Sequence, residues 1–240
     1  MLGSIEKENY NDDTLGEHIR QPEIRNILLR YGLDVEKISK PGEGSNYPLL
    51  ERTLPDLCAD RIDYALREGI YWYLPEAKRY LDYLMVHDHE FIFSSRIEAK
   101  SFGEHYLKCY REYWGSAEWR IRYYFLSKAL KEAMKDGMIG MKDLYLKEEE
   151  LIGKMRKEGT AEENRCILLA LGNFSFEVND TGDIFLGKMK KRYVDPKFIE
   201  EGKVRRLSEV DEAFKKQIKV ESERNTEMRV QILPNAQQQG

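Results

Sequence analysis

The clearest pattern in the sequence is the segment over residues 54–68, Leu54-Pro55-Asp56-Leu57-Cys58-Ala59-Asp60-Arg61-Ile62-Asp63-Tyr64-Ala65-Leu66-Arg67-Glu68. Its apolar residues recur at the 3.6-residue period of an α-helix and fall on one arc of the helical wheel: Leu54, Cys58, Ile62, Ala65 and Leu66. Its polar residues fall on the opposite arc: Asp60, Arg61, Tyr64 and Glu68. The pattern therefore predicts a helix that packs one face and presents chemical groups on the other.

The rest of the chain is also dominated by helical spacing. Helices are expected within residues 15–33, 76–84, 97–114, 118–136, 147–155 and 161–172. A tight turn or small hairpin is expected over 85–93, loop residues over 40–47, and strands around 174–178, 184–186 and 188–194. These patterns predict a mainly α fold, with a helical domain over 1–172, a small antiparallel β segment within 173–233 and a disordered tail over 234–240.

Composition narrows the class of protein. The 240 residues are 41% hydrophobic and 34% charged, which is typical of a soluble globular protein rich in amphipathic helices. A net charge of −4 provides no general attraction to nucleic acid or to anionic membranes, and neither partner is expected. No apolar run approaches the roughly 20 residues of a membrane helix, and the first eight residues are too polar for a secretory signal, so a cytoplasmic location is expected. The three scattered cysteines predict core residues rather than disulfides: Cys58, Cys109 and Cys166.

The string over 59–68 resembles the last metal-site motif of HD-superfamily phosphohydrolases of the deoxynucleoside triphosphate triphosphohydrolase type, D-[RK]-x-D-Y-x-x-R-D. The resemblance implies that Asp60 binds a divalent metal ion, that Arg61 approaches phosphate and that Tyr64 lines the substrate pocket. Glu68 stands where the family has Asp and would contact the substrate. Residues 90–144, 192–196 and 206–210 resemble later parts of such proteins, so the likeness extends over most of the chain. It implies an HD-like helical bundle.

The same family also uses an earlier His and an adjacent His-Asp pair. Upstream of Asp60 the chain has one histidine, His18, and its neighbours form no such pair. The chain therefore resembles a relative that begins after the first two metal motifs. His87-Asp88 follows Asp60 and lies in an expected turn, so a solvated role is favoured for it and for His89. His105 is expected on the polar side of its helix, and the basic run over 188–192 is expected to protect a sheet edge, the alternative being contact with an anionic ligand or another subunit.

Two functional hypotheses follow. The first is a metal-dependent phosphohydrolase acting on (deoxy)nucleotide phosphates, with Mn²⁺, Mg²⁺, Fe or Zn²⁺ as cofactor if the metal site is complete. The second is a catalytically incomplete family member that serves as a binding or oligomerisation module. A shortened bundle would expose apolar surface, so the second hypothesis also predicts self-association, a partner protein or low stability. Both predict a nucleotide or another phosphorylated small molecule as ligand.

Overall fold

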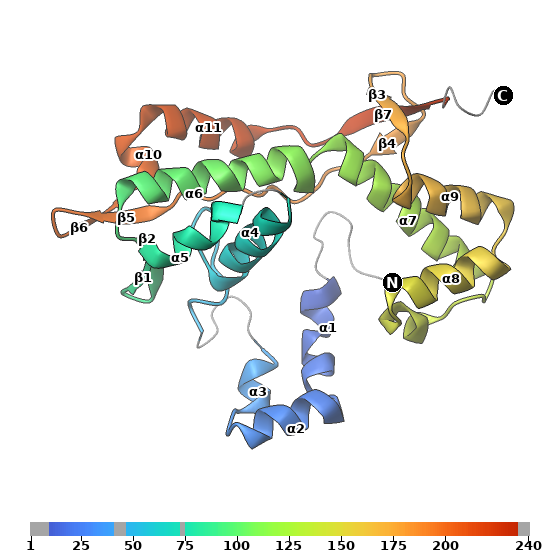
Figure 1. Cartoon of the computed structure of the whole chain (residues 1–240), viewed down its shortest axis with the longest axis horizontal. Coiled ribbons are helices and arrows are strands. Elements are labelled where there is room, and N and C mark those ends of the chain that lie inside the picture. Colours follow the sequence, from blue (N-terminus) through green and yellow to red (C-terminus); the bar gives the residue numbers. More distant parts are fainter. Residues whose placement is uncertain (1–9, 41–46, 73–74, 235–240) are drawn as a thin grey trace. The chain divides into compact units, whose positions relative to one another are not determined.

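The computed structural model describes residues 10–40, 47–72 and 75–234, which group into two compact units (Figure 1). Unit 1 holds the described residues up to Glu112 together with Met189–Asn225. Unit 2 holds Tyr113–Lys188 and the described residues from Thr226 onward. This grouping cuts across the predicted boundary at residue 172. Residues 41–46 of the predicted loop and residues 235–240 of the predicted tail lie outside the described residues.

Unit 1 is built around one central helix. Its helices are α1 (Tyr10–Ile19), α2 (Pro22–Arg30), α3 (Val35–Ile38), α4 (Ala59–Tyr71), a 3-10 helix (Pro75–Arg79), α5 (Tyr80–Tyr83), α6 (Arg96–Cys109), α10 (Leu207–Val210) and α11 (Glu212–Glu223). In Figure 1, α6 lies between α4 and α5 on one side and α11 on the other. The approach of α11 is close, because a Cβ added at Gly103 of α6 would lie 2.6 Å from the ring of Phe214. Gly103 therefore permits this packing.

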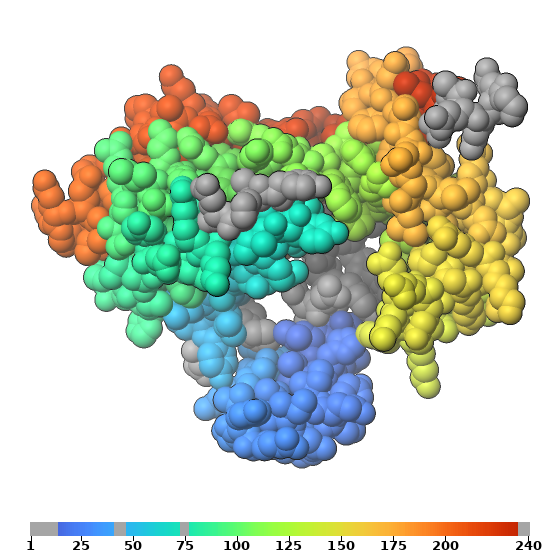
Figure 2. Space-filling view, viewed as in Figure 1, coloured from blue at the N-terminus to red at the C-terminus, as the bar shows by residue number. Residues whose placement is uncertain are grey.

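A mixed four-stranded sheet completes unit 1. Its strands are β1 (Leu84–His87), β2 (Glu90–Phe93), β5 (Lys197–Glu200) and β6 (Lys203–Arg206), in the order β1-β2-β5-β6. The pairs β1–β2 and β5–β6 are antiparallel, and β2 and β5 are parallel, with Phe93 opposite Phe198. The outer ends of the β5–β6 hairpin form an exposed orange tip in Figure 2.

Both hairpins turn through two residues with positive φ. Asp88 and His89 have φ of 46° and 62°, and Glu201 and Gly202 have φ of 50° and 74°. Two successive residues of this conformation match the twist of the flanking strands. The hairpin predicted over 85–93 is confirmed, whereas the β5–β6 hairpin was not predicted.

Helix α4 begins later than the sequence pattern indicated. The predicted start at Leu54 is wrong: the helix begins at Ala59, and Cys58 is extended, with φ −144° and ψ 167°. The backbone groups that a longer helix would use are bonded elsewhere, because the Pro55 carbonyl accepts a hydrogen bond from the Asp195 amide and the Ala59 amide donates to the Leu49 carbonyl. Tertiary hydrogen bonds therefore set the helix boundary.

Unit 2 packs a helical hairpin against a three-stranded antiparallel sheet. Its elements are α7 (Ala117–Lys135), a 3-10 helix (Met141–Tyr145), α8 (Glu148–Glu158), α9 (Ala161–Leu171), β3 (Ser175–Val178), β4 (Ile184–Leu186) and β7 (Met228–Leu233), with sheet order β3-β7-β4. A π-helix, Tyr110–Trp114, joins α6 to this unit along the chain. The core is apolar and includes Ile121, Phe125, Met155, Ile167 and Val230.

The protein is mostly helical, with two small sheets. This confirms a helix-rich fold with antiparallel strands near the C-terminus and corrects the prediction of a single β segment, because a second, mixed sheet lies in unit 1. The strand predicted over 188–194 is absent from the sheets of the described residues. Over those same residues, no helix is long and apolar enough to cross a membrane.

Candidate functional site

Three of the four predicted site residues form a row along α4. Asp60, Tyr64 and Glu68 are spaced by four residues, which places them on one face of the helix. Asp60 is exposed, while Tyr64 and Glu68 are half-buried. On the neighbouring face Arg67 forms an exposed ion pair with Asp63, with an Nη2–Oδ2 distance of 3.0 Å. The row combines two carboxylates with one phenol, and we call it the α4 acidic face.

Arg61 departs from the predicted arrangement. The sequence placed it on the exposed arc with Asp60, but the structure buries it. Its Nη2 donates to Oε1 of Glu51 at 2.9 Å, and its Nη1 donates to the Asp56 carbonyl at 3.0 Å and approaches Sγ of Cys58 at 3.3 Å. The reason is that the segment before α4 folds back as a loop and places hydrogen-bond partners next to the guanidinium. A longer helix would have placed these partners elsewhere.

Tyr64 shares a hydrogen bond with Tyr106 of α6, hydroxyl to hydroxyl. Burial raises the pKa of Tyr64 to about 12, against the opposing effects of the Tyr106 hydrogen bond and of the charges of Arg192 and Arg61. Burial also raises the pKa of Tyr106 well above its usual value. Both phenols therefore keep their protons at physiological pH.

A buried histidine lies between α4 and α6. Nε2 of His105 is 3.0 Å from the carbonyl oxygen of Ala65 and 3.6 Å from Sγ of Cys109. A Cβ added at Gly69 would lie 2.7 Å from the His105 ring, so the glycine makes room for it. The prediction of an exposed His105 is wrong, because the imidazole is only 7% exposed, and burial lowers its pKa.

The three cysteines are buried and free, which confirms the prediction that they are core residues. Burial, with the charge of Glu68 next in importance, raises the pKa of Cys109 to about 12. Burial also raises the pKa of Cys58. These thiols are therefore poor candidates for nucleophiles, which need a readily formed thiolate.

The described part of the chain contains no candidate metal site. No group of three or more His, Cys, Asp or Glu residues within it is arranged to hold a metal ion. His87 is instead 3.4 Å from Asp88, at the exposed β1–β2 turn. Because a tightly bound transition metal requires several ligands in fixed geometry, Asp60 and its described neighbours do not by themselves fit the metal that the family resemblance implies.

An ion-pair network that the sequence did not reveal anchors the segment before α4 to the mixed sheet. Arg52 pairs with Glu90 at 2.7 Å, Lys197 with Glu90 at 2.5 Å, and Arg206 with Asp56 at 2.5 Å. The five side chains are 21–27% exposed. Their positions span 150 residues of sequence between Asp56 and Arg206, so no local pattern could have grouped them. The network holds in place the loop that contains the partners of Arg61.

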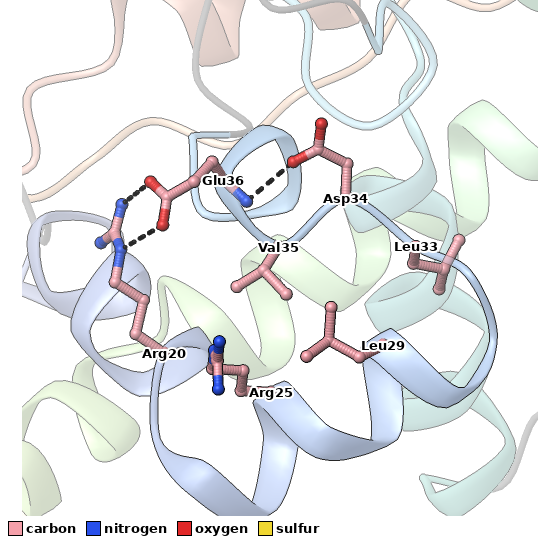
Figure 3. A pocket seen from close by; sticks show the side chains of 7 residues that line it. All are labelled: Arg20, Arg25, Leu29, Leu33, Asp34, Val35 and Glu36. Carbon is pink, nitrogen blue, oxygen red and sulfur yellow. Dashed lines mark hydrogen bonds and ion pairs between the residues drawn. The ribbon is translucent and has the colours of Figure 1, made fainter.

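A separate open depression of about 470 Å³ lies among the N-terminal helices (Figure 3). It is lined by Arg20, Arg25, Leu29, Leu33, Asp34, Val35 and Glu36. Arg20 donates two hydrogen bonds to the Glu36 carboxylate, at 3.0 and 2.7 Å. Asp34 caps α3 by accepting hydrogen bonds from the backbone amides of Glu36 and Lys37. Much of its charge is thus internally paired, and none of the predicted site residues lines it.

The chain is similar to a bacterial protein over most of its own length. The chain is 29% identical over 213 residues to the uncharacterized protein YdhJ of Bacillus subtilis (strain 168). The alignment covers 87% of this chain but 65% of the relative, so the chain spans less than two thirds of that protein's length. No family model matches the sequence, and no solved structure matches it.

Proposed function

We propose that this chain is an HD-type phosphohydrolase-like protein and that the α4 acidic face binds the phosphate or sugar groups of a (deoxy)nucleotide. The observation that carries the proposal is the row of Asp60, Tyr64 and Glu68 on one face of the helix that bears the family-like motif. On a helix face that only contacts solvent, Tyr64 would not need a second, buried phenol to hold it in place. Here the Tyr106 hydroxyl does so.

The chemistry of these side chains suits a nucleotide. Tyr64 keeps its proton at physiological pH and can donate a hydrogen bond to a phosphate or sugar oxygen. Glu68 can accept a hydrogen bond from a sugar hydroxyl. Asp60 would serve the metal ion implied by the family resemblance, but the described residues provide no complete ligand set, and we derive no step through a metal.

A second candidate function is ligand binding without turnover. The observation that favours it is the position of Arg61, whose guanidinium already bonds Glu51, the Asp56 carbonyl and the Cys58 sulfur. To stabilise charge on a reacting phosphate, Arg61 would have to leave these three partners, of which Cys58 is buried. A protein that keeps Arg61 in place would bind nucleotides without the cation that assists phosphate chemistry.

The two candidates are separated by measuring binding and turnover on the same samples. Nucleotide binding is measured by calorimetry, and phosphate release is measured with deoxyribonucleoside and ribonucleoside triphosphates in Mn²⁺ or Mg²⁺. The phosphohydrolase predicts turnover that Asp60→Ala reduces to the blank rate. The matched control is Asp82→Ala, which removes another exposed aspartate of unit 1 from α5.

The outcomes distinguish the alternatives. Turnover lost in Asp60→Ala and retained in Asp82→Ala supports the phosphohydrolase. Binding without turnover supports the second candidate. A folded protein that neither binds nor hydrolyses any nucleotide of the panel would refute the proposed function.

A further inference from the structure

The tyrosine pair joins the core of unit 1 to the α4 acidic face. Tyr64 and Tyr106 share a hydroxyl–hydroxyl hydrogen bond, and their ring centroids are 5.8 Å apart at an interplanar angle of 48°. Tyr106 is 0% exposed, whereas Tyr64 is half-buried. One phenol is thus embedded in the core, and the other reaches the surface where the ligand is proposed to bind.

The buried member of the pair is held by aromatic packing. The ring of Tyr106 lies 6.4 Å from that of Phe102, which in turn lies 5.3 Å from Phe93 of β2 and 5.4 Å from Tyr80 of α5. Phe102, Phe93 and Tyr106 are all fully buried. A close-packed cluster of this kind holds its side chains in fixed rotamers, so the Tyr106 hydroxyl has a defined position.

A buried hydroxyl needs a hydrogen-bond partner, because leaving it unpaired away from water costs free energy. The Tyr64 hydroxyl is such a partner for Tyr106. The bond restricts rotation of the Tyr64 phenol, which loses less conformational freedom when a ligand arrives. A hydroxyl carries one proton and two acceptor sites, so when Tyr106 donates to the Tyr64 oxygen, the Tyr64 proton is directed to another acceptor.

We propose that Tyr106 is a positioning residue for Tyr64: its buried hydroxyl orients the Tyr64 phenol so that the phenol donates to a phosphate or sugar oxygen of a bound nucleotide. The inference rests on the proposed function, because it requires that the ligand contact Tyr64. Tyr106 acts only through Tyr64 and makes no contact with the ligand. The effect of substituting Tyr106 on nucleotide affinity should therefore depend on the Tyr64 hydroxyl. A general contribution of Tyr106 to folding would not show this dependence.

A double-mutant cycle measured on nucleotide affinity tests the proposal. The full chain and its Tyr64→Phe, Tyr106→Phe and doubly substituted forms are titrated with each of the four deoxynucleoside triphosphates by calorimetry. Tyr106→Phe is expected to weaken binding by about fivefold to tenfold, which corresponds to one hydrogen bond of about 1 kcal/mol. In the Tyr64→Phe background the same substitution is expected to have no further effect.

The matched control is Tyr80→Phe. Tyr80 is also buried and packs on Phe102, but its hydroxyl bonds Oγ of Ser101 at 2.9 Å. The substitution is expected to leave affinity unchanged. Phe retains the ring packing at position 106; if that variant does not fold, Tyr106→Met fills the apolar space without a hydroxyl and replaces it in the cycle.

The outcomes for the inference and for the proposed function differ. Affinity that is unchanged in Tyr106→Phe, or reduced equally with and without the Tyr64 hydroxyl, overturns the positioning role and leaves the proposed function standing. A wild-type protein that binds none of the four nucleotides overturns both. Weakened binding that depends on Tyr64 supports the inference.

Discussion

The buried polar side chains of the two units have different kinds of hydrogen-bond partner. In unit 1 two of them bond to other side chains, Tyr64 to Tyr106 and Arg61 to Glu51, although Arg61 also bonds a backbone carbonyl. In unit 2 the buried Arg120 donates to the carbonyls of Thr226, Leu186 and Gly187, all of them backbone groups. Backbone partners are required by the fold itself. Side-chain pairs are costly to bury and are not required by the backbone, so the pairs beside the α4 acidic face support the proposed ligand site in unit 1.

The largest expected effect comes from breaking the unit 2 arrangement. Arg120→Met removes the donor to three carbonyls, and we expect the free energy of unfolding to fall by about 3–5 kcal/mol, because each buried carbonyl left without a donor costs about 1–3 kcal/mol. Nucleotide affinity is expected to stay unchanged. Urea unfolding monitored by circular dichroism measures the first quantity and calorimetry the second.

The control for this change is Lys131→Met on the same helix, where the side chain is exposed. It is expected to alter stability by no more than about 0.5 kcal/mol. A loss in Arg120→Met as small as in this control would show that the three carbonyls do not depend on the guanidinium.

A smaller effect is expected from Arg61→Met in unit 1. Its partner Glu51 has a side chain that is 42% exposed, so the carboxylate can turn to water when the guanidinium is removed. We therefore expect a loss of about 2–3 kcal/mol in the free energy of unfolding, less than for Arg120. Arg67→Met, which removes an exposed arginine of the same helix, serves as the control. An Arg61→Met protein of unchanged stability that no longer binds nucleotide would contradict the structural pairing and assign Arg61 to the ligand.

Two helical glycines provide the next comparison. Gly69→Ala would place a Cβ 2.7 Å from the His105 ring, whereas Gly153→Ala in α8 of unit 2 meets no atom within 4 Å. We expect the first to lower the free energy of unfolding by about 1–2 kcal/mol, because overpacking outweighs the gain in helix propensity. The second is expected to raise it by up to about 1 kcal/mol. Thermal unfolding of both variants measures the difference. Equal effects of the two substitutions would show that the His105 ring moves away from the added Cβ without a cost in stability.

The fold was predictable where one periodic pattern persisted over several turns. The long helices around Phe102 and Phe125 followed from their spacing, and the β1–β2 hairpin followed from the apolar runs on either side of its polar turn. The β5–β6 hairpin was missed because its strands are four residues long and rich in charge, although Glu201-Gly202 was a usable turn signal.

The site was predictable only in part, because periodic spacing shows which residues share a helix face but not which residues from other elements they contact. Spacing alone placed Asp60, Tyr64 and Glu68 on one face. It could not place Arg61, whose direction depends on the loop containing Glu51, nor select Tyr106, whose hydroxyl meets Tyr64 only when α6 packs on α4. Contacts between residues distant in sequence thus decided which polar groups became partners.

His105 gives the smallest expected effect and a direct test of buried chemistry in unit 1. Burial lowers its pKa, so the unfolded chain, where histidine titrates near pH 6.5, takes up a proton that the folded protein resists. The stability contributed by neutral His105 is therefore fully present above about pH 7 and is lost as the pH falls below about 6.5, until the folded protein is protonated as well. His105→Gln is expected to flatten this part of the stability curve, as measured by urea unfolding between pH 5 and 8.

The control is His87→Gln in the exposed β1–β2 turn, which should retain the wild-type slope because its side chain is 45% exposed and lies outside the α4–α6 contact. A wild-type protein that instead gained stability on acidification would require His105 to be charged in the folded state. It would then face the Ala65 carbonyl as a cation, and burial would not control its protonation. The same pH series on the two histidine variants thus decides whether burial keeps His105 neutral at the α4–α6 contact.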